Sequence, residues 1–195
     1  MTSRSAMDRK KWEELYASGA RPDRPPSSWV VDTLATLPND IRLLDVAGGT
    51  GRHAGPAARP GRVVVLADIA LEAVTRARAV NGVLHGVVAD APNLPFRAGS
   101  FNGVLVTNFL DRSIFPDLVS LLAPGGYLVY ETYTVAHEEL VRRGLARGPQ
   151  SPDYLLQPGE LPALARPLRT IEYMEVDVED AAGRRCCARL VAQRT

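Results

Sequence analysis

Short apolar runs alternate with amphipathic segments along most of the chain. Five runs are rich in Val, Leu and Ile and are bounded by turn residues, which is typical of buried strands in a parallel sheet. These predicted strands span residues 41–46, 62–68, 83–90, 102–109 and 127–133. Apolar residues at helical spacing, with Ser, Gly and Pro near the boundaries, predict helices between the strands. The helices span residues 6–18, 27–37, 71–80, 113–123, 136–146 and 159–166, with a short one from Arg52 to just before Pro60.

The order of these elements predicts a single domain, residues 1–195, with a Rossmann-like α/β fold. Strands that alternate with helices form a doubly wound parallel sheet with right-handed crossovers and helices on both faces. The last segment reads instead as two antiparallel strands joined by a DAAG turn. We therefore expect seven strands, five parallel in the core and two in a C-terminal hairpin. The expected parts are N-terminal helices (1–37), a binding core (38–135), a substrate-side helix and loop (136–166) and the closing hairpin (167–195).

Composition and charge exclude several classes of protein. The chain has 195 residues, 46% of them hydrophobic, and its 23 basic and 22 acidic residues give a net charge of +1. Binding to a nucleic-acid backbone needs clustered Lys and Arg, and no such cluster occurs. No apolar run approaches the roughly 18 residues of a membrane span, and the first residues do not resemble a signal peptide. We expect a cytoplasmic protein, monomeric or homodimeric, with no nucleic-acid or membrane partner.

The two cysteines, Cys186 and Cys187, are adjacent, so in a strand they point to opposite faces. That arrangement suits neither a disulfide nor a shared metal site, and no metal-ligand spacing occurs elsewhere. We therefore expect reduced thiols and no metal. The three histidines, His53, His85 and His137, are interpreted as structural.

A glycine-rich stretch, LLDVAGGTGRHAG, follows the first strand from Leu43 to Gly55. Ligands of open α/β sheets bind beyond the carboxyl ends of the strands, and glycines let the backbone approach them closely. The segment Gly49–Ala54 fits the dinucleotide fingerprint G-x-G-x-x-G/A, so an NAD-dependent oxidoreductase is one hypothesis. Two features argue against it: the chain is short for a second catalytic domain, and Asp45 would repel a pyrophosphate while suiting a cationic amino-acid group.

Acidic residues end three consecutive predicted strands, at Asp45, Asp68 and Asp90. A carboxylate at the end of the second strand can accept hydrogen bonds from ribose hydroxyls in either nucleotide hypothesis. The ordered set of three suits a ligand that carries an ammonium group, a diol and an exocyclic amine. The plainer alternative is that each Asp caps the turn or helix after it.

At these motifs the chain resembles the class I S-adenosylmethionine-dependent methyltransferases. DVAGGTG is similar to their D-x-G-x-G-x-G motif, with Ala47 at the first glycine, and VVVLAD, VVADAPNLPF and LAPGGYLVYET resemble their later motifs. A narrower resemblance, through KKWEELYASG and DVAGGTGRHA, is to bacterial tellurite-resistance and thiopurine-methyltransferase-like enzymes. The chain departs from that group at Leu15, where an arginine is common, and the acid usual after the third motif is replaced by Asn102.

The resemblance implies S-adenosyl-L-methionine as the cofactor, with S-adenosyl-L-homocysteine as product. The implied cofactor-binding residues are Trp12, Tyr16, Asp45, Ala47, Gly48, Gly49, Gly51, Asp68, Ile69, Asp90, Ala91, Asn108 and Phe109. Asp45 and the glycine loop would hold the methionine portion, Asp68 the ribose, and Ile69, Asp90 and Ala91 the adenine. The helices of residues 1–37 would cover the donor through Trp12 and Tyr16, although core packing explains these two aromatics equally well.

Methyl transfer from a sulfonium is an in-line displacement that depends mainly on a dry, oriented pocket. The acceptor-side candidates are Asn108, Asp111, Arg112 and Tyr133. Asp111 could accept a proton and Arg112 could hold an anionic substrate, or they are a helix cap and a surface charge.

The loop of residues 148–161 is long enough to form a lid, with Tyr154 at its tip. A nucleic-acid base methyltransferase is disfavoured, because the segment after the fourth strand lacks the Asn-Pro-Pro-aromatic turn that stacks a flipped base. We predict a methyltransferase acting on a small molecule. The remaining alternative is a non-catalytic binding module with the same fold.

Overall fold

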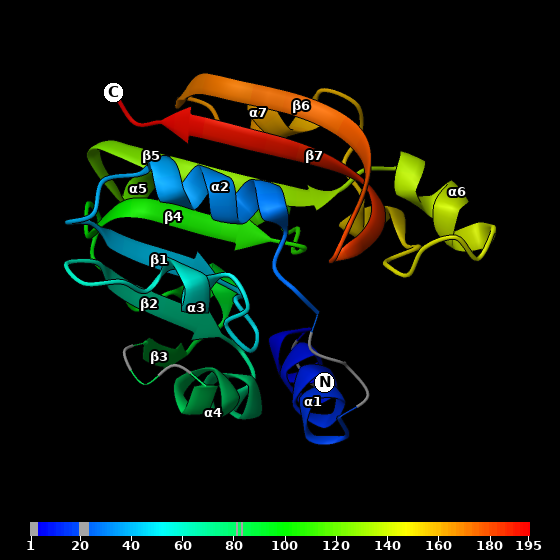
Figure 1. The fold of residues 1–195 in the computed structure, drawn as a ribbon, viewed down its shortest axis with the longest axis horizontal. Coiled ribbons are helices and arrows are strands. Elements are labelled where there is room, and N and C mark those ends of the chain that lie inside the picture. Colours follow the sequence, from blue (N-terminus) through cyan, green and yellow to red (C-terminus); the bar gives the residue numbers. More distant parts are fainter. Residues whose placement is uncertain (1–3, 20–23, 81, 83) are drawn as a thin grey trace.

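A computed structural model describes residues 4–19, 24–80, 82 and 84–195. One seven-stranded sheet organises the protein, with strand order β3-β2-β1-β4-β5-β7-β6 (Figure 1). The strands are β1 Arg42–Val46, β2 Val63–Asp68, β3 His85–Val88, β4 Phe101–Thr107, β5 Leu122–Tyr133, β6 Arg169–Asp180 and β7 Gly183–Gln193. Strands β1 to β5 pair in parallel, and β7 is antiparallel to both β5 and β6. The predicted Rossmann-like α/β sheet, five parallel strands plus a closing hairpin, is confirmed.

Helices cover both faces of the sheet (Figure 1). They are α1 Arg4–Ala17, α2 Ser28–Thr36, α3 Ala54–Ala57, α4 Leu71–Val80, α5 Phe115–Leu121, α6 Ala136–Arg142 and α7 Glu160–Leu164. Short 3-10 turns are η1 Ala91–Asn93, η2 Arg112–Ile114 and η3 Pro152–Tyr154. The apolar residues of α2, α3 and α4 pack on one face, and those of α5 and α7 pack on the other. Helix α1 contacts α4. None of the described helices has the length and apolarity needed to cross a membrane.

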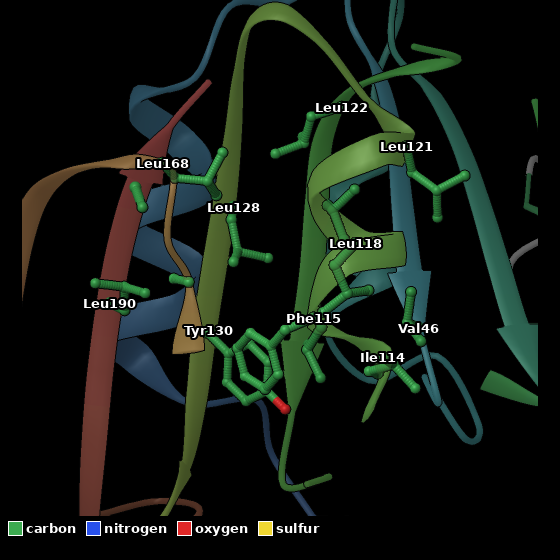
Figure 2. Close-up of a cluster of buried hydrophobic side chains, with 14 of the residues drawn as sticks. Val46, Ile114, Phe115, Leu118, Leu121, Leu122, Leu128, Tyr130, Leu168 and Leu190 are labelled. Atoms are coloured by element: carbon green, nitrogen blue, oxygen red, sulfur yellow. The ribbon is translucent and has the colours of Figure 1, made fainter. Parts of the chain in front are cut away.

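Alternation along the strands decides which side chains reach which face. In β4, Val104 and Val106 join the cluster under α5, whereas Leu105 joins the cluster under α2. Figure 2 shows the α5 side, where the rings of Phe115 and Tyr130 stack with centroids 5.3 Å apart. Successive strand residues point to opposite faces, and Val106 and Tyr130 belong to the α5 side. The residues that follow them, Thr107 and Glu131, therefore face α2. That parity determines which polar side chains meet near the carboxyl ends of the strands.

Several element boundaries differ from the sequence prediction. Helix α3 is a single turn, Ala54–Ala57, because the chain is already extended at Ala58, shortly before Pro60. Strand β3 is shorter than predicted. Helix α6 ends early at Arg142, since Gly144 adopts a positive φ that stops the helix.

The Pro-Gly-Gly stretch of residues 124–126 was predicted as a turn before the fifth strand. It lies instead inside β5, as an irregular insertion between two paired parts of that strand. Leu122 pairs with Phe101, and pairing resumes with Tyr127 opposite Gly103. The strand therefore starts earlier than the apolar pattern indicates, because its first residues pair across a bulge.

Candidate functional site

The three acids predicted at the strand ends lie along one edge of the sheet. Strands β1, β2 and β3 are neighbours, so their carboxyl ends meet there. Asp45 is 1% exposed and Asp68 6% exposed, while Asp90 follows β3 and is partly buried. The side chain of Asp90 makes no capping hydrogen bond to η1. The geometry brings the predicted row of acids together around the glycine loop.

Asp68 fastens the glycine loop to the end of β2. Its Oδ2 accepts a hydrogen bond from the Gly49 N–H at 2.8 Å, and its Oδ1 accepts one from the Ala70 N–H at 3.0 Å. The second bond holds the start of the α4 region, so the plainer capping interpretation is partly correct for this residue. Each carboxylate oxygen can accept more than one hydrogen bond.

Two glycines of the loop lie too close to neighbouring side chains to carry a Cβ of their own. A Cβ on Gly48 would lie 2.8 Å from the Asp45 carboxylate, and a Cβ on Gly49 would lie 2.6 Å from the Tyr16 hydroxyl. Gly49 and Gly51 also have positive φ angles, of 58° and 79°. Ala47, at the motif's first glycine, adopts φ 52° as well, a conformation that costs a non-glycine residue energy.

Asp45 is a buried carboxylate whose two oxygens make no hydrogen bond of normal geometry within the described residues. Burial first, and then repulsion from Asp68, raise the pKa of Asp45 to about 7, against the opposing effects of Arg52 and the Ala54 amide. A buried acid without partners is costly unless it meets a cation or a hydrogen-bond donor. This part of the site is therefore suited to a positively charged ligand group.

Helix α1 covers the same edge of the sheet. Tyr16 is 6% exposed and packs with Ala70 and Ala73, and the Trp12 ring lies 6.1 Å from the Tyr16 ring. The Glu13 carboxylate accepts a hydrogen bond from the Glu72 N–H, at the first turn of α4, at 3.3 Å. The Tyr16 hydroxyl lies beside Gly49, and Trp12 and Tyr16 form a small core with Ala70 and Ala73. Their role as a cover over the donor stays a prediction.

A cleft of about 800 Å³ separates α1 from the ends of β2 and β3. On the sheet side it is lined by Ile69, Leu71 and Val88, and on the helix side by residues that include Arg9 and Glu13. Ile69 is half-buried, and Ala91, one of the predicted adenine contacts, is buried. The cleft therefore opens beside Ile69, one of the residues predicted to hold an adenine ring.

The residues predicted at the acceptor side follow β4 and end β5. Asn108 adopts φ 51° and donates its N–H to the Glu131 carbonyl at 2.8 Å. The Phe109 carbonyl accepts a hydrogen bond from the Tyr130 hydroxyl at 2.9 Å. Tyr133 packs against the ring of the buried His137, with centroids 4.4 Å apart.

Asp111 and Arg112 have protein partners. Asp111 caps η2, since its Oδ1 accepts bonds from the Ser113 N–H at 2.9 Å and the Ser113 hydroxyl at 2.6 Å. Arg112 forms a two-point ion pair with Glu160, with N–O distances of 2.6 and 3.0 Å. Arg112 also donates to the carbonyls of Asp153 and Leu155, which fastens the predicted lid loop to the end of β4. These contacts favour the capping and anchoring interpretations; the acceptor-side roles stay predictions.

Sequence reasoning missed a buried polar network on the α2 face. Glu131, 1% exposed, pairs with Arg189 at 2.8 Å and Arg185 at 3.4 Å, and accepts a bond from the Ser27 hydroxyl at 3.0 Å. Arg185 also pairs with Asp180 at 2.8 Å. The sequence does contain one indication of this network. Glu131 is a single acid within the apolar strand β5, and Arg185 and Arg189 lie four residues apart in β7, which places them on the same face of the sheet.

Two of the three histidines that the sequence analysis interprets as structural, His53 and His137, are buried. His53 is 2% exposed and contacts Ser27 and Thr107 through its two ring nitrogens. His137 accepts a hydrogen bond from the Cys186 N–H at 3.3 Å.

Cys186 and Cys187 are free thiols, and burial raises the pKa of Cys187 to about 12. Within the described residues, no cluster of His, Cys, Asp and Glu is arranged to hold a metal ion.

Residues 44–130 match a protein family described as "Methyltransferase domain". The match runs from β1 through β5 and includes the glycine loop, the three strand-end acids and the segment after β4. Over these residues the chain is similar to class I methyltransferase domains. The predicted resemblance to this class is confirmed, whereas the narrower resemblance to the tellurite-resistance and thiopurine group stays a prediction.

Curated relatives of this chain include enzymes named for quinones. The chain is 36% identical over 111 residues to a demethylmenaquinone methyltransferase of Clavibacter sepedonicus, covering 53% of this chain and 45% of that protein. It is 28% identical over 158 residues to a ubiquinone biosynthesis O-methyltransferase of Bordetella bronchiseptica, covering 71% and 65%. The chain therefore spans about half the length of the first of these relatives.

Solved structures share the fold of this chain at low identity. A methyltransferase from Methanosarcina mazei described as SAM-dependent aligns with a TM-score of 0.69 and 21% identity, over 87% of this chain and 98% of that one. The [4+2]-cyclase SpnF aligns with a TM-score of 0.71 and 15% identity, over 98% and 96%. Because one fold carries different named activities, the activity of this chain has to be argued from its site.

Proposed function

We propose that this chain binds S-adenosyl-L-methionine and transfers its methyl group to a small-molecule acceptor. The observation that carries the proposal is the buried Asp45, whose oxygens lack hydrogen bonds of normal geometry and lie next to a second acid, Asp68. When bound, the donor supplies a methyl group on a positively charged sulfur, together with an ammonium group. A pocket whose nearest charges are two carboxylates and Arg52 attracts such a ligand.

The residues around the glycine loop fit the parts of this donor. Asp45 would bind the ammonium group, and the loop of residues 47–51 would pass close to the methionine portion. Asp68 would accept bonds from the ribose hydroxyls while it holds the Gly49 N–H. Ile69, Asp90 and Ala91 would border the adenine, beside the cleft under α1. Trp12 and Tyr16 would exclude water from above, which favours a displacement that consumes positive charge.

The acceptor would lie near the segment after β4. Asn108 and Phe109 would border the transferred methyl group, and Tyr133 would line the acceptor side. Asp111 and Arg112 would contribute through the shape of the segment they hold, in addition to the proton-accepting and anion-holding roles predicted above. A thiol, phenol or quinol whose nucleophile is ionised at neutral pH needs no strong base. The name of the ubiquinone biosynthesis O-methyltransferase supports an aromatic hydroxyl as the first acceptor class to test.

An NAD-dependent oxidoreductase is the less favoured candidate. A dinucleotide would place its pyrophosphate at the glycine loop, directly over the two acids that end β1 and β2. One of these acids is already raised in pKa to about 7, partly by repulsion from the other. Two further negative charges would increase that repulsion. The site therefore favours a cationic nucleoside over a dinucleotide.

Calorimetric titration tests the proposed donor. The full chain should bind S-adenosyl-L-methionine, and NADH, titrated in parallel, should not bind. Asp68→Ala should weaken donor binding by about 1–3 kcal/mol, because charge-assisted hydrogen bonds are lost. Asp117→Ala is the matched control, since Asp117 is exposed on α5, on the other face of the sheet, and should leave the donor affinity unchanged.

Two results would contradict this assignment. No heat of binding at millimolar donor would remove the enzyme hypothesis and favour the non-catalytic binding module. Wild-type donor affinity in a folded Asp68→Ala protein would refute the placement of the ribose. For the acceptor, a radiolabelled methyl-transfer screen should cover quinols and phenols first, then thiols, metalloid oxyanions and small acids.

A further inference from the structure

His53 joins three parts of the molecule through its imidazole ring. Nε2 lies 3.0 Å from the Ser27 backbone nitrogen, and Nδ1 lies 3.1 Å from the Thr107 hydroxyl. A backbone N–H only donates, so Nε2 must be the acceptor. In a neutral ring the proton then lies on Nδ1, which donates to the Thr107 hydroxyl oxygen. The contacts therefore fix one tautomer.

The three connected segments are those that the proposed reaction has to align. His53 follows the last glycine of the donor loop, Gly51, by two residues. Thr107 ends β4 and immediately precedes Asn108, at the predicted acceptor side. Ser27 lies just before α2, in the chain that leads from the covering helix α1. One buried ring thus spans the donor loop, the acceptor segment and the N-terminal segment.

We propose that His53 is a positioning residue that sets the donor loop at a fixed distance from the acceptor end of β4, through its Nδ1–H bond to Thr107. This inference rests on the proposed methyl-transfer function. His53 does not contact the reacting atoms in the proposal; it acts through the backbone of the loop on one side and through Thr107 on the other.

The surroundings of Thr107 support a positioning role rather than simple packing. Thr107 and Glu131 are direct partners across β4 and β5, and Glu131 is the direct partner of Arg189 across β5 and β7. These three side chains form a buried polar row on the α2 face. Ser27 connects His53 to this row, because the Ser27 N–H donates to His53 and the Ser27 hydroxyl donates to Glu131. Directional hydrogen bonds fix distances more tightly than apolar contacts of the same volume.

The charge state of the ring agrees with this role. Burial, and then the positive charges of Arg52 and Arg185, lower the pKa of His53 to about 3. The ring is therefore neutral near pH 7 and keeps the single proton that the Thr107 contact uses. An error of about 1 Å in the alignment of reacting groups can slow a reaction on the order of 100-fold. Losing the His53–Thr107 bond should thus affect turnover more than donor binding.

Variants of Thr107 provide the sharpest test, because they leave the imidazole in place. Thr107→Val removes the hydroxyl at similar volume, and Thr107→Ser keeps it. Thr36→Val is the matched control, since Thr36 is exposed on α2 and its hydroxyl binds only within that helix. Donor-binding sites are counted by calorimetry, and kcat and both KM values are measured per donor site with the acceptor found in the screen. Thermal unfolding is recorded for every variant.

Thr107→Val should lower kcat per donor site by about tenfold or more while changing the donor dissociation constant by less than about threefold. Thr107→Ser should restore kcat, and Thr36→Val should match the wild type. If Thr107→Val loses thermal stability but keeps wild-type kcat per donor site, His53 is only a packed core residue and the proposal is overturned. A wild-type chain that binds no donor would instead refute the proposed function, and the inference would fall with it.

Imidazole nitrogen NMR gives a readout that does not depend on activity. The chain has three histidines, so His53→Gln identifies the His53 signals by their loss. The wild type should show the Nδ1-protonated neutral form at pH 7, and Thr107→Val should shift the Nδ1 signal. An Nε2-protonated ring in the wild type would contradict the hydrogen-bond assignment on which the proposal stands.

Discussion

Ala47 carries the backbone conformation of the glycine it replaces in the methyltransferase motif. Its φ of 52° lies in the left-handed region, which costs an alanine about 1 kcal/mol relative to glycine. Gly48, the next residue, has no room for a side chain, so the loop cannot relax toward it. The substitution is tolerated because the Ala47 methyl group is small.

Ala47→Gly should therefore stabilise the protein. We expect a gain of up to about 1 kcal/mol in the free energy of unfolding, reduced by the greater freedom of glycine in the unfolded chain. Urea unfolding monitored by circular dichroism measures it. An equal substitution at Ala35, on the exposed part of α2, should destabilise the protein instead. Loss of stability on Ala47→Gly would mean that the Ala47 methyl group contributes packing that outweighs the strain.

Asp45 predicts an unusual dependence of stability on pH. Its folded-state pKa of about 7 is above its ordinary value of 3.8, so the folded protein holds this proton more tightly than the unfolded chain does. Ionising Asp45 therefore destabilises the fold, and the loss grows as pH rises from about 4 to about 7. Below that window the contribution is absent.

Asp45→Asn cannot ionise, so it should gain stability relative to the wild type as the pH rises. The difference in unfolding free energy should shift in favour of Asn by up to about 4 kcal/mol between pH 4 and pH 8, at about 1.4 kcal/mol per pKa unit. Urea unfolding at several pH values measures this difference. A difference that stays constant over the range would show that Asp45 ionises normally in the folded protein.

The sequence predicted some site residues far better than others. Asp45, Asp68 and Asp90 could be placed together because each ends a strand, and parallel strands end at one edge of the sheet. Glu131 could not be joined to its partners in the same way. Ser27 and Arg185 lie 104 and 54 residues away from it, and no local pattern connects them. The sequence allowed Arg112 to be interpreted only as a surface charge or a substrate contact, because its ion-pair partner, Glu160, is 48 residues away.

At the scale of elements, contacts with α4 hold α1 at the sheet edge. Its apolar contacts include Tyr16 and Trp12 against Ala70 and Ala73, and its polar contacts include the Glu13 bond to the first turn of α4. A carboxylate at a helix N-terminus also interacts favourably with the helix dipole. Glu13 therefore contributes to the attachment of α1.

Glu13→Ala should loosen α1 while leaving the sheet intact. We expect a cost of about 1 kcal/mol to the docking of α1, as for the loss of a helix cap. Hydrogen exchange of α1 amides should accelerate about fivefold, while that of β4 amides should not change. Glu13→Gln keeps a side-chain oxygen acceptor and should have the smaller effect. Equal acceleration in α1 and β4 would show global destabilisation rather than undocking.

Element boundaries were less predictable than element types. The apolar runs identified the five parallel strands, and the two segments flanking the DAAG turn identified the hairpin strands β6 and β7. The early start of β5 at Leu122 was missed, since proline and two glycines ordinarily mark a turn. Pairing with Phe101 on the neighbouring strand decides that boundary, and this contact is made only in the folded sheet.

At the scale of the whole molecule, the sheet order brings the site together. The order β3-β2-β1-β4 reverses direction between β1 and β4, where an open sheet forms a crevice at its carboxyl edge. The donor loop follows β1 and the acceptor segment follows β4, so both border this crevice. Helix α1 lies over one side of it and the loop anchored by Arg112 over the other. The fold thus accounts for where the proposed chemistry takes place, while individual side chains account for which ligand fits.

Strand β7 is an interior strand of the sheet although it follows every other strand in the sequence. Until residues 183–193 have been synthesised, β5 has an open edge and the Glu131 carboxylate has neither of its arginine partners. A nascent chain that has reached β6 therefore exposes a strand edge and an uncompensated acid at the same place. Docking of β7 consequently closes the open edge of β5 and neutralises the buried Glu131 in the same step.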